Sequence, residues 1–338
     1  MDMPSAINAV IDKRDLTRDE MTEVMRNIMT GDATPAQIGG FLVGLRMKGE
    51  TVDEITAAAS VMRELATAVE VSGEHVVDIV GTGGDGSSTF NISTACTFVV
   101  AAAGGTVAKH GNRSISSKSG SADLLEAAGV NLDLDATQVA KCISDVGVGF
   151  MFAPKHHSAM KHAIGPRKEM GVRTVFNLLG PLTNPAGVPN LLLGVYDAAW
   201  VEPIAMVLQK LGTHHAMVVH SDDGMDEISI AAETKVSELK QGKITNYKIN
   251  PADFGLQQSD LKSIVVDGAE QSLKIIKSVF NGDKSPARDI VLLNSGAAIY
   301  VAGLSDSLAS GIEKAQQVID DGSAMKKLKS LAEFSQGL

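Results

Sequence analysis

The feature that most constrains the fold is a change of pattern near residue 75. Before it, the 338-residue chain shows only helical patterns, whereas after it short apolar segments alternate with helical ones. Strands are expected at 76–80, 106–108, 148–152, 191–196 and 216–220. Helices are expected between and after them, at 93–103, 122–128, 158–170 and 199–211. Alternation at this spacing predicts an α/β domain whose central sheet is mostly parallel.

The residues before this change predict a small all-helical domain. Three segments open with residues typical of helix N-termini, Thr17 with Glu20, Thr34 with Gln37, and Thr51 with Glu54, and the third helix is expected to run to about residue 68. We expect a helical domain at 1–70, with part of 165–190 as a candidate addition, and an α/β domain at 71–338. A peripheral hairpin is expected at 228–249, centred on Gln241, and helices are expected to complete the C-terminus.

Charge and cysteine content exclude several classes of protein. With 30 basic and 40 acidic residues the net charge is −10, which repels nucleic-acid backbones, so an anionic ligand requires a local positive cluster. Two cysteines, Cys96 and Cys142, predict neither a disulfide framework nor a zinc site. The first ten residues lack the features of a signal peptide, and the most apolar stretch is shorter than the ~20 residues that span a bilayer. We expect a cytoplasmic protein that binds neither nucleic acid nor membrane.

The first candidate site is the glycine-rich segment that begins at Gly81. It reads Gly-Thr-Gly-Gly-Asp-Gly-Ser-Ser-Thr-Phe-Asn-Ile-Ser-Thr, ends at Thr94, and lies between an expected strand and an expected helix. Glycines there let the backbone approach a ligand, and helix N–H groups point at an anion. It is neither a Walker P-loop nor the GxGxxG dinucleotide pattern. The alternative is a glycine-rich turn followed by an ordinary helix cap.

A basic segment from Lys109 to Ser121 is the second candidate. Three cations and five hydroxyl groups fall within it, directly after an expected strand. Cations combined with hydroxyl and backbone donors are typical of phosphate binding, which we favour over an exposed basic loop.

Two further segments carry candidate ligand groups. Ser221 to Glu227 is rich in carboxylates and follows an expected strand, so its hard oxygen atoms suit Mg²⁺, although acidic surface turns are common. Residues 152–167 contain several histidines and lysines, which are most often surface or hydrogen-bonded residues. Within that segment Arg167 could bind a carboxylate through two parallel hydrogen bonds.

Taken together, these motifs resemble one family. The GTGGD loop, N-I-S-T, K-H-G-N-R-S-x-S-S-x-S-G-S-A-D-x-L-E, H-x-A-M-K-H, and R-T-x-F-N-x-L-G-P-L-x-N-P (173–185) occur in this order. The sequence closely resembles the anthranilate phosphoribosyltransferase family of tryptophan biosynthesis, densely to about Glu227 and more loosely beyond it. The resemblance implies a fold like that of pyrimidine nucleoside phosphorylases, with a hinged cleft between the two domains. It also implies a homodimer formed through the helical domain.

The resemblance further implies sites for phosphoribosyl pyrophosphate, Mg²⁺ and anthranilate. The residues implied around the phosphates and ribose are Gly81, Gly84, Asp85, Thr89, Asn91, Ser93, Thr94, Lys109, Ser117 and Ser121. Ser93, Asp226 and Glu227 match the positions associated with Mg²⁺. Asn112 and Arg167 match the anthranilate positions, with His110 and His157 nearby in the acceptor channel. The residues around Pro166 differ slightly from the usual family spelling, but the register of Arg167 is kept.

The implied reaction moves the phosphoribosyl group to the amine of anthranilate. Lys109 and Mg²⁺ would stabilise the departing pyrophosphate electrostatically, and Arg167 would hold the anthranilate carboxylate. Because the aromatic amine is already neutral near pH 7, positioning is expected to contribute most, with His110 as a candidate base for the released proton.

Two other functions are alternatives to this one. A pyrimidine nucleoside phosphorylase would share the fold but would need no such metal site. A non-catalytic relative that binds nucleic acid or a protein should have lost acceptor residues and gained a basic face.

Overall fold

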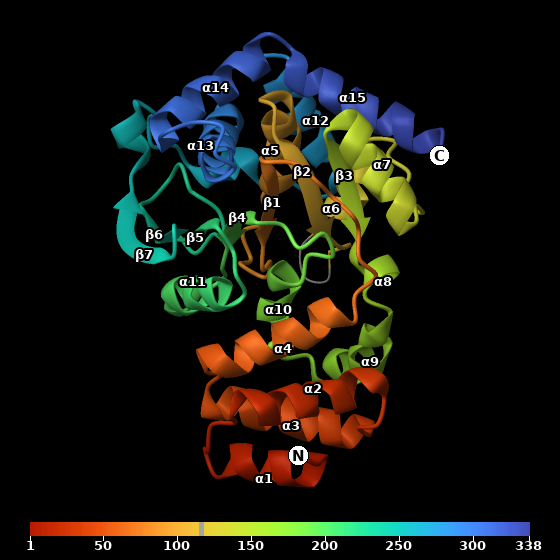
Figure 1. Ribbon diagram of the computed structural model, residues 1–338. Coiled ribbons are helices and arrows are strands. Elements are labelled where there is room, and N and C mark those ends of the chain that lie inside the picture. Colours follow the sequence, from red (N-terminus) through yellow and green to blue (C-terminus); the bar gives the residue numbers. More distant parts are fainter. Residues whose placement is uncertain (115–117) are drawn as a thin grey trace.

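The computed structural model describes residues 1–114 and 118–338 and has two lobes of unequal size (Figure 1). The smaller lobe is entirely helical. Its helices are α1 (Met3–Ile11), α2 (Arg18–Thr30), α3 (Pro35–Lys48), α4 (Val52–Glu64) and, from later in the chain, α9 (Lys161–Met170) and α10 (Phe176–Leu182). The chain therefore enters the larger lobe after α4, returns to the smaller one at α9, and leaves it again after α10.

The larger lobe is built on a seven-stranded sheet of order β3-β2-β1-β4-β5-β6-β7. The strands are β1 (Val76–Gly81), β2 (Thr106–Gly111), β3 (Val148–Phe152), β4 (Asn190–Gly194), β5 (His215–Ser221), β6 (Thr234–Lys240) and β7 (Lys243–Ile249). The first five are parallel, and β6 and β7 form an antiparallel hairpin at one edge. The expected α/β fold with a mostly parallel sheet and a helical N-terminal region is confirmed.

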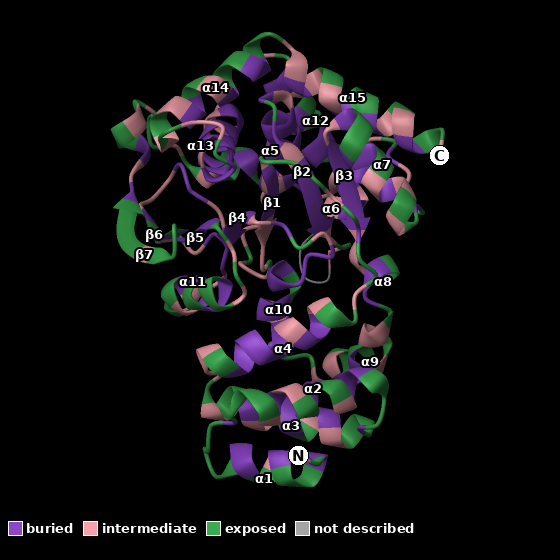
Figure 2. Ribbon diagram, viewed as in Figure 1, coloured by how far each residue is buried: buried purple, intermediate pink, exposed green. Residues whose placement is uncertain are grey.

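The other helices of the larger lobe lie around the sheet or pack on the helices that cover it (Figure 1). They are α5 (Ile92–Ala102), α6 (Ser121–Ala127), α7 (Ala136–Val146), α8 (Ala153–His156), α11 (Val201–Lys210), α12 (Ala269–Phe280), α13 (Pro286–Val301), α14 (Leu308–Asp320) and α15 (Ser323–Gln336). Short 3₁₀ turns lie at Ser158–Met160, Ala198–Trp200, Pro251–Phe254 and Leu261–Ile264. The central strands and most of α13 are buried (Figure 2).

Alternation along the strands divides the apolar core into two clusters. Leu192 and Met217 belong to a cluster with α5 and α13, whereas the neighbouring Leu191 and Val218 belong to a cluster with α11 and the helical lobe. Successive side chains of a strand point to opposite faces, which explains the division. The helical lobe thus shares one continuous apolar core with one face of the sheet.

Most expected elements lie within a few residues of their predicted bounds, but several differ or were not expected. The helix begun by Thr51 ends at Glu64 rather than near residue 68, and the hairpin occupies 234–249 rather than 228–249. Helix α1 was not expected, because its N-cap Asp2 precedes a short segment with a weak helical pattern. Helices α7 and α10 were also missed, and α10 contains Pro181, which disfavours a helical prediction.

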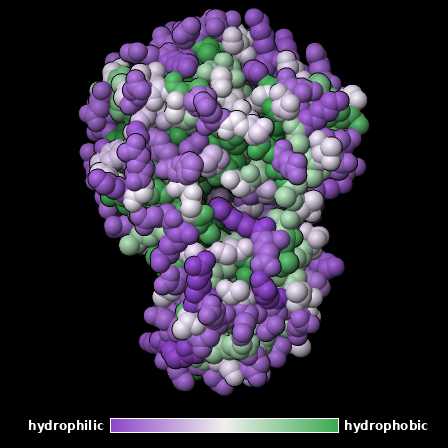
Figure 3. All heavy atoms as spheres, in the orientation of Figure 1, coloured by the Kyte–Doolittle hydropathy of each residue, from purple (hydrophilic) through white to green (hydrophobic). Residues whose placement is uncertain are grey.

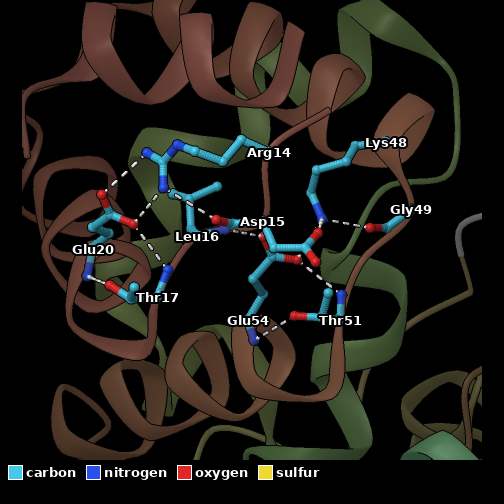
Figure 4. A network of polar contacts seen from close by, with 9 residues as sticks. All are labelled: Arg14, Asp15, Leu16, Thr17, Glu20, Lys48, Gly49, Thr51 and Glu54. Atoms are coloured by element: carbon cyan, nitrogen blue, oxygen red, sulfur yellow. Dashed lines mark hydrogen bonds and ion pairs between the residues drawn. The ribbon is translucent and has the colours of Figure 1, made fainter. Parts of the chain in front are cut away.

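A polar network fixes the connections within the helical lobe (Figure 4). The buried carboxylate of Glu54 accepts the backbone N–H of Leu16 at 2.8 Å and that of Thr51 at 2.8 Å. Lys48 donates to Glu54 at 3.0 Å and to Asp15 at 2.6 Å. One carboxylate therefore caps α4 and also ties it to the loop between α1 and α2, which satisfies donors that would otherwise be buried without partners.

Candidate functional site

The candidate site lies where the strand order changes direction, between β1 and β4. Chain connections run from β1 outward through β2 and β3, and from β4 outward through β5, so the loops after β1 and β4 diverge. In open α/β sheets, ligands bind at this switch point, outside the carboxyl ends of the strands. Figure 3 shows a narrowing of the molecule between the two lobes, where strongly hydrophilic side chains lie.

Asp226 sits directly on the ends of these two strands. A Cβ atom added to Gly81 would lie 2.3 Å from its Oδ2 atom, and one added to Gly194 would lie 1.5 Å from its backbone oxygen. The two glycines are neighbours in the β1–β4 register. Only glycine permits this close approach, so Gly194 belongs to the site although the sequence alone did not single it out.

The glycine-rich loop wraps around the Asp226 carboxylate. The backbone N–H of Gly83 donates to Asp226 Oδ2 at 2.7 Å, and Gly84 adopts a left-handed φ of +78°. The Asp85 carboxylate accepts the hydroxyl of Ser87 at 2.6 Å, and Thr89 forms an isolated antiparallel bridge with Val265. The loop is therefore held at both ends, and the glycines in its middle offer backbone groups rather than side chains.

Two adjacent carboxylates, Asp226 and Glu227, lie beside this loop, where the charge of Asp85 in the loop acts on both and that of Lys109 acts on Glu227. Burial and the nearby charge of Asp85 raise the pKa of Asp226 to about 7. Burial and the charge of Asp226 raise the pKa of Glu227 well above its usual range, although Lys109 opposes the shift. The Glu227 carboxylate also accepts the backbone N–H of Ser93 at the start of α5. Such concentrated negative charge favours binding of a cation.

Lys109 is a buried cation whose charge acts on Glu227. It is 1% exposed and its Nζ atom donates to the backbone oxygen of Ile79 at 2.6 Å. Burial lowers its pKa, while the charges of Asp78 and Glu227 act in the opposite direction. Asp78 in turn accepts from the Asn184 amide at 2.7 Å. The lysine is thus a buried point charge below the loop.

The donor set fits Mg²⁺ bound together with a substrate. Magnesium prefers oxygen ligands and usually keeps water, taking one or two protein carboxylates plus substrate phosphates. Asp226 and Glu227 are adjacent carboxylates whose mutual repulsion a dication relieves. Over residues 1–114 and 118–338, no three His, Cys, Asp or Glu side chains are grouped as a ready-made metal site. The geometry therefore favours a metal site that a phosphorylated ligand completes.

The structure separates the cations of the basic segment. Whereas Lys109 lies under the loop, Arg113 pairs with Asp123 and Glu126, and Lys118 pairs with Asp267. Both latter side chains are about half exposed. The segment is therefore not a single cradle in which all three cations face one ligand. Ser117, which the sequence implied as a phosphate ligand, lies outside the described residues.

Three of the implied polar residues join the two loops to each other. The Asn91 amide oxygen accepts the Ser119 hydroxyl at 2.9 Å and the Ser272 hydroxyl at 2.8 Å, and its amide nitrogen donates to the backbone of Ser119 at 3.0 Å. Thr94 donates to Ser121 at 3.0 Å between their hydroxyls. In this structure, therefore, Asn91, Thr94 and Ser121 brace the loops.

Two buried histidines lie together beside β2. The ring centroids of His110 and His157 are 5.0 Å apart. Burial, with the charge of the neighbouring histidines, lowers the pKa of His110 to about 3 and that of His157 to about 4. Backbone groups of Gly180 and Thr183 hydrogen-bond to the two rings, and both Nε2 atoms lack a hydrogen-bond partner among the described residues. Both rings are therefore neutral, and each has one buried nitrogen that forms no hydrogen bond among the described residues.

Arg167 and Asn112 come from two different segments. The Arg167 guanidinium lies 5.0 Å from the centroid of the Phe176 ring, and burial lowers its pKa. Within residues 1–114 and 118–338, no carboxylate forms an ion pair with it. The Asn112 side-chain oxygen accepts the backbone N–H of Arg113 at 2.7 Å. A partly buried arginine without an anion is suited to a carboxylate ligand.

Comparisons with known proteins agree with this geometry. Residues 4–66 match the helical bundle domain of a glycosyl transferase family, and residues 73–325 match the a/b domain of that family. The chain is 64% identical to the anthranilate phosphoribosyltransferase of Thioalkalivibrio sulfidiphilus over 99% of both chains.

Solved structures of the same kind of enzyme match the whole fold. The crystal structure of anthranilate phosphoribosyltransferase from Thermus thermophilus superposes with a TM-score of 0.93 at 42% identity, covering 98% of this chain and 99% of that one. The Saccharomyces cerevisiae enzyme in complex with PRPP (phosphoribosyl pyrophosphate) and Mg superposes with a TM-score of 0.90 at 26% identity, covering 99% of this chain and 98% of that one. Its complex with 4-fluoroanthranilate gives 0.88 at 26% identity, with the same coverage.

Proposed function

The chain belongs to the anthranilate phosphoribosyltransferase family, and we propose that the site between β1 and β4 transfers a phosphoribosyl group to anthranilate. The donor is phosphoribosyl pyrophosphate, and the products are N-(5-phosphoribosyl)anthranilate and pyrophosphate. The protein is thus a Mg²⁺-dependent glycosyltransferase of tryptophan biosynthesis. The observation that carries the residue assignment is the packing of the Asp226 carboxylate against Gly81 and Gly83 at the switch point of the sheet.

On the donor side, the loop from Gly81 to Asp85 and the N-terminus of α5 supply backbone N–H groups for the pyrophosphate. Lys109 stabilises the charge that develops on the leaving pyrophosphate, acting from within the protein where water screens it little. Thr89, Asn91, Ser93, Thr94, Ser117 and Ser121 remain assigned to the phosphates and ribose as a proposal. Since Asn91, Thr94 and Ser121 already bond to each other's loops, they contribute by keeping those loops in register.

Asp226 and Glu227 would hold Mg²⁺, with Ser93 beside them. When bound, the metal neutralises the pyrophosphate and so makes it a better leaving group. The protein's own part is to keep the two carboxylates adjacent, and the N–H groups of Gly83 and Ser93 donate to them and so favour their ionised forms against the effect of burial.

On the acceptor side, Arg167 binds the anthranilate carboxylate and Asn112 orients the ring. His110 and His157 line the channel as neutral imidazoles. Because the aromatic amine is a neutral nucleophile, holding it against the ribose carbon is the main contribution of these residues. The free Nε2 atom of His110 is the candidate acceptor for the proton that the amine loses. With a pKa near 3 it is a weak base, so the proton passes quickly to solvent or to phosphate.

A pyrimidine nucleoside phosphorylase and a non-catalytic relative are less favoured. The carboxylate pair has no use in phosphorolysis, and the Arg167, His110 and His157 groups expected for an acceptor are retained.

We also propose a homodimer formed through the helical lobe. Ile11 of α1 and Val43 and Met47 of α3 are 65%, 38% and 80% exposed, and the two α3 residues lie one turn apart. A second copy of the chain would cover these apolar side chains. We further expect the protein to work in the cytoplasm, where its two buried thiols, Cys96 and Cys142, stay reduced. No helix within residues 1–114 and 118–338 combines the length and apolar character needed to cross a bilayer.

The test is to follow the loss of anthranilate fluorescence with purified protein, phosphoribosyl pyrophosphate and Mg²⁺. Turnover should require both the sugar donor and the metal. A folded protein that leaves anthranilate unchanged but cleaves thymidine or uridine in phosphate would be a phosphorylase instead.

A further inference from the structure

Arg173 connects three parts of the molecule that are distant in sequence. It lies between α9 and α10, and its guanidinium lies over the ring of Tyr196, 4.3 Å from the centroid. Its Nη2 atom donates to the backbone oxygen of Gly84 in the glycine-rich loop. Its own backbone oxygen accepts a hydrogen bond from Arg46 of α3. The helical lobe is thus joined to the loop through one residue.

The hydrogen bond to Gly84 fixes a particular peptide. A trans peptide is planar, so its C=O and N–H groups point in opposite directions. When Arg173 holds the oxygen of Gly84, the N–H of Asp85 must therefore point away from Arg173. Gly84 has a φ of +78° and no Cβ, so without this bond the Gly84–Asp85 peptide could rotate.

The rest of the loop is anchored to the sheet instead. The N–H of Thr82 donates to the oxygen of Gly194 at 2.9 Å, and that of Gly83 donates to Asp226. Tyr196, on which Arg173 stacks, donates its N–H to the Thr82 hydroxyl at 3.0 Å. Thr82 and Gly83 therefore keep their places whatever the helical lobe does, whereas the bond from Arg173 to Gly84 depends on it.

We propose that Arg173 is a positioning residue for the donor substrate, which orients the Gly84–Asp85 peptide so that its N–H can bind pyrophosphate. Arg46 holds Arg173 in place, and the orientation of the loop is therefore coupled to the position of the helical lobe. This inference rests on the proposed function for the identity of the ligand, but the coupling itself is a property of the unliganded protein.

The experiment compares Arg173→Ala, Arg173→Lys and Arg46→Ala with the unchanged protein. Lys168→Ala is the matched control, because Lys168 is an exposed cation in the last turn of α9 and its loss changes the net charge equally. For each protein, KM for both substrates and kcat are measured. Hydrogen–deuterium exchange of the unliganded proteins is followed at residues 82–90.

Loss of one hydrogen bond from a charged donor should raise KM for phosphoribosyl pyrophosphate about tenfold in Arg173→Ala. We expect KM for anthranilate and kcat to stay within about twofold, since Gly84 of the donor loop is the proposed substrate-binding residue to which the Arg173 side chain donates. Exchange at residues 84–88 should accelerate in the same variant. Arg173→Lys should recover part of the loss, because lysine still donates to Gly84, and Arg46→Ala should produce a smaller change of the same sign.

Two results would overturn the proposal. One is an equal rise of both KM values, which would indicate general damage to the cleft. The other is a raised donor KM with unchanged exchange in the unliganded loop, which would make Arg173 a direct ligand. If the unchanged protein had no transferase activity, the proposed function would fail, whereas the exchange data would still test the coupling.

Discussion

At the scale of single residues, the site concentrates like charges where they destabilise the empty protein. Asp226 and Glu227 are adjacent carboxyls, buried enough that both have raised pKa values, and Lys109 offsets the charge of Glu227 only in part. Repulsion of this kind is relieved when a cation binds, so the energy that folding loses becomes affinity for the metal. Asp226 and Glu227 are thus arranged for binding Mg²⁺ rather than for stability.

Glu227→Gln should therefore separate stability from function. The amide keeps an oxygen that can accept the Ser93 N–H but cannot ionise, so the cost of a buried carboxyl beside Asp226 is removed, and we expect the metal-free protein to gain about 1–2 kcal/mol in the free energy of unfolding. The same variant should need much more Mg²⁺ for half-maximal activity. Thermal denaturation without metal and an activity titration with MgCl₂ measure the two effects. An unchanged Mg²⁺ titration would remove Glu227 from the metal site.

Arg167→Ala should mainly affect the acceptor. Two charged hydrogen bonds to a carboxylate would be lost, so KM for anthranilate should rise about tenfold to a hundredfold, with a much smaller effect on phosphoribosyl pyrophosphate. Arg167→Lys keeps the charge without the planar guanidinium group. Its KM for anthranilate should lie between those of the unchanged protein and Arg167→Ala. Steady-state kinetics with each substrate varied in turn provide the measurement, and equal effects on both KM values would contradict the role.

The histidine pair predicts how stability depends on pH. The pKa of His110 is about 3 in the folded protein, lower than that of an unfolded histidine, near 6.5. Between these values the unfolded chain binds a proton that the folded protein does not. Stability should then fall as the pH decreases from about 6.5 toward 3, by up to about 1.4 kcal/mol per pH unit for this residue.

His110→Gln tests this pH dependence, because glutamine does not titrate. Urea denaturation at several pH values between 4 and 7 should give a shallower loss of stability in the variant, whatever its stability at pH 7. His162→Gln is the control, since His162 lies in α9 and its ring packs against Gly31 of the helical lobe. Parallel curves for the His110 variant and the unchanged protein would show that this ring titrates normally.

At the scale of elements, the site depends on two strand ends that approach a loop too closely for any side chain. In Gly194→Ala the new methyl group would overlap the Asp226 backbone, where even a shift of the loop costs about 1–3 kcal/mol. We expect the variant to fold but to lose Mg²⁺-dependent activity, because the carboxylates move. Gly165→Ala in α9, where no atom lies within 4 Å, is the matched control and should stay active. Full activity of Gly194→Ala would show that the loop yields without moving the carboxylates.

Sequence patterns predicted elements best where a local rule decides the structure. The capping boxes at Thr17, Thr34 and Thr51 open α2, α3 and α4, and the strand expected at 148–152 has the observed bounds. Helix α7 also opens with a capping box, Asp135 with Gln138, which was overlooked. Helix α10, with its Gly180 and Pro181, forms because tertiary packing buries its apolar residues, and no local pattern predicts that.

The site shows the same limit. Resemblance to a known family placed Asp226 and Glu227 beside the glycine-rich loop, and the structure brings Asp226 into contact with Gly83. The resemblance could not show that Gly194 makes room for this contact, or that Arg113 and Lys118 form ion pairs with other carboxylates. These features arise from segments far apart in the chain. The spacing of the segments in the sequence does not indicate how closely they approach each other in the fold.

At the scale of the whole molecule, the proposed dimer would cover the exposed apolar side chains of α1 and α3. Met47→Glu places a charge in that surface, so the mass measured by light scattering should fall to that of a single chain. Met206→Glu is the control, because Met206 is also exposed, at 42%, but belongs to α11 in the larger lobe. A protein that is already monomeric before substitution would refute the dimer.

The return of the chain to the helical lobe has a consequence for its synthesis. Helices α1 to α4 leave the ribosome first, but Ala163, Val175 and Phe176 of their shared core follow only after three strands of the sheet. The growing chain must therefore expose an incomplete apolar surface on the helical lobe while β1, β2 and β3 are being synthesised. Translation pauses before residue 161 would lengthen that exposure. Chaperones would then bind the smaller lobe rather than the larger one.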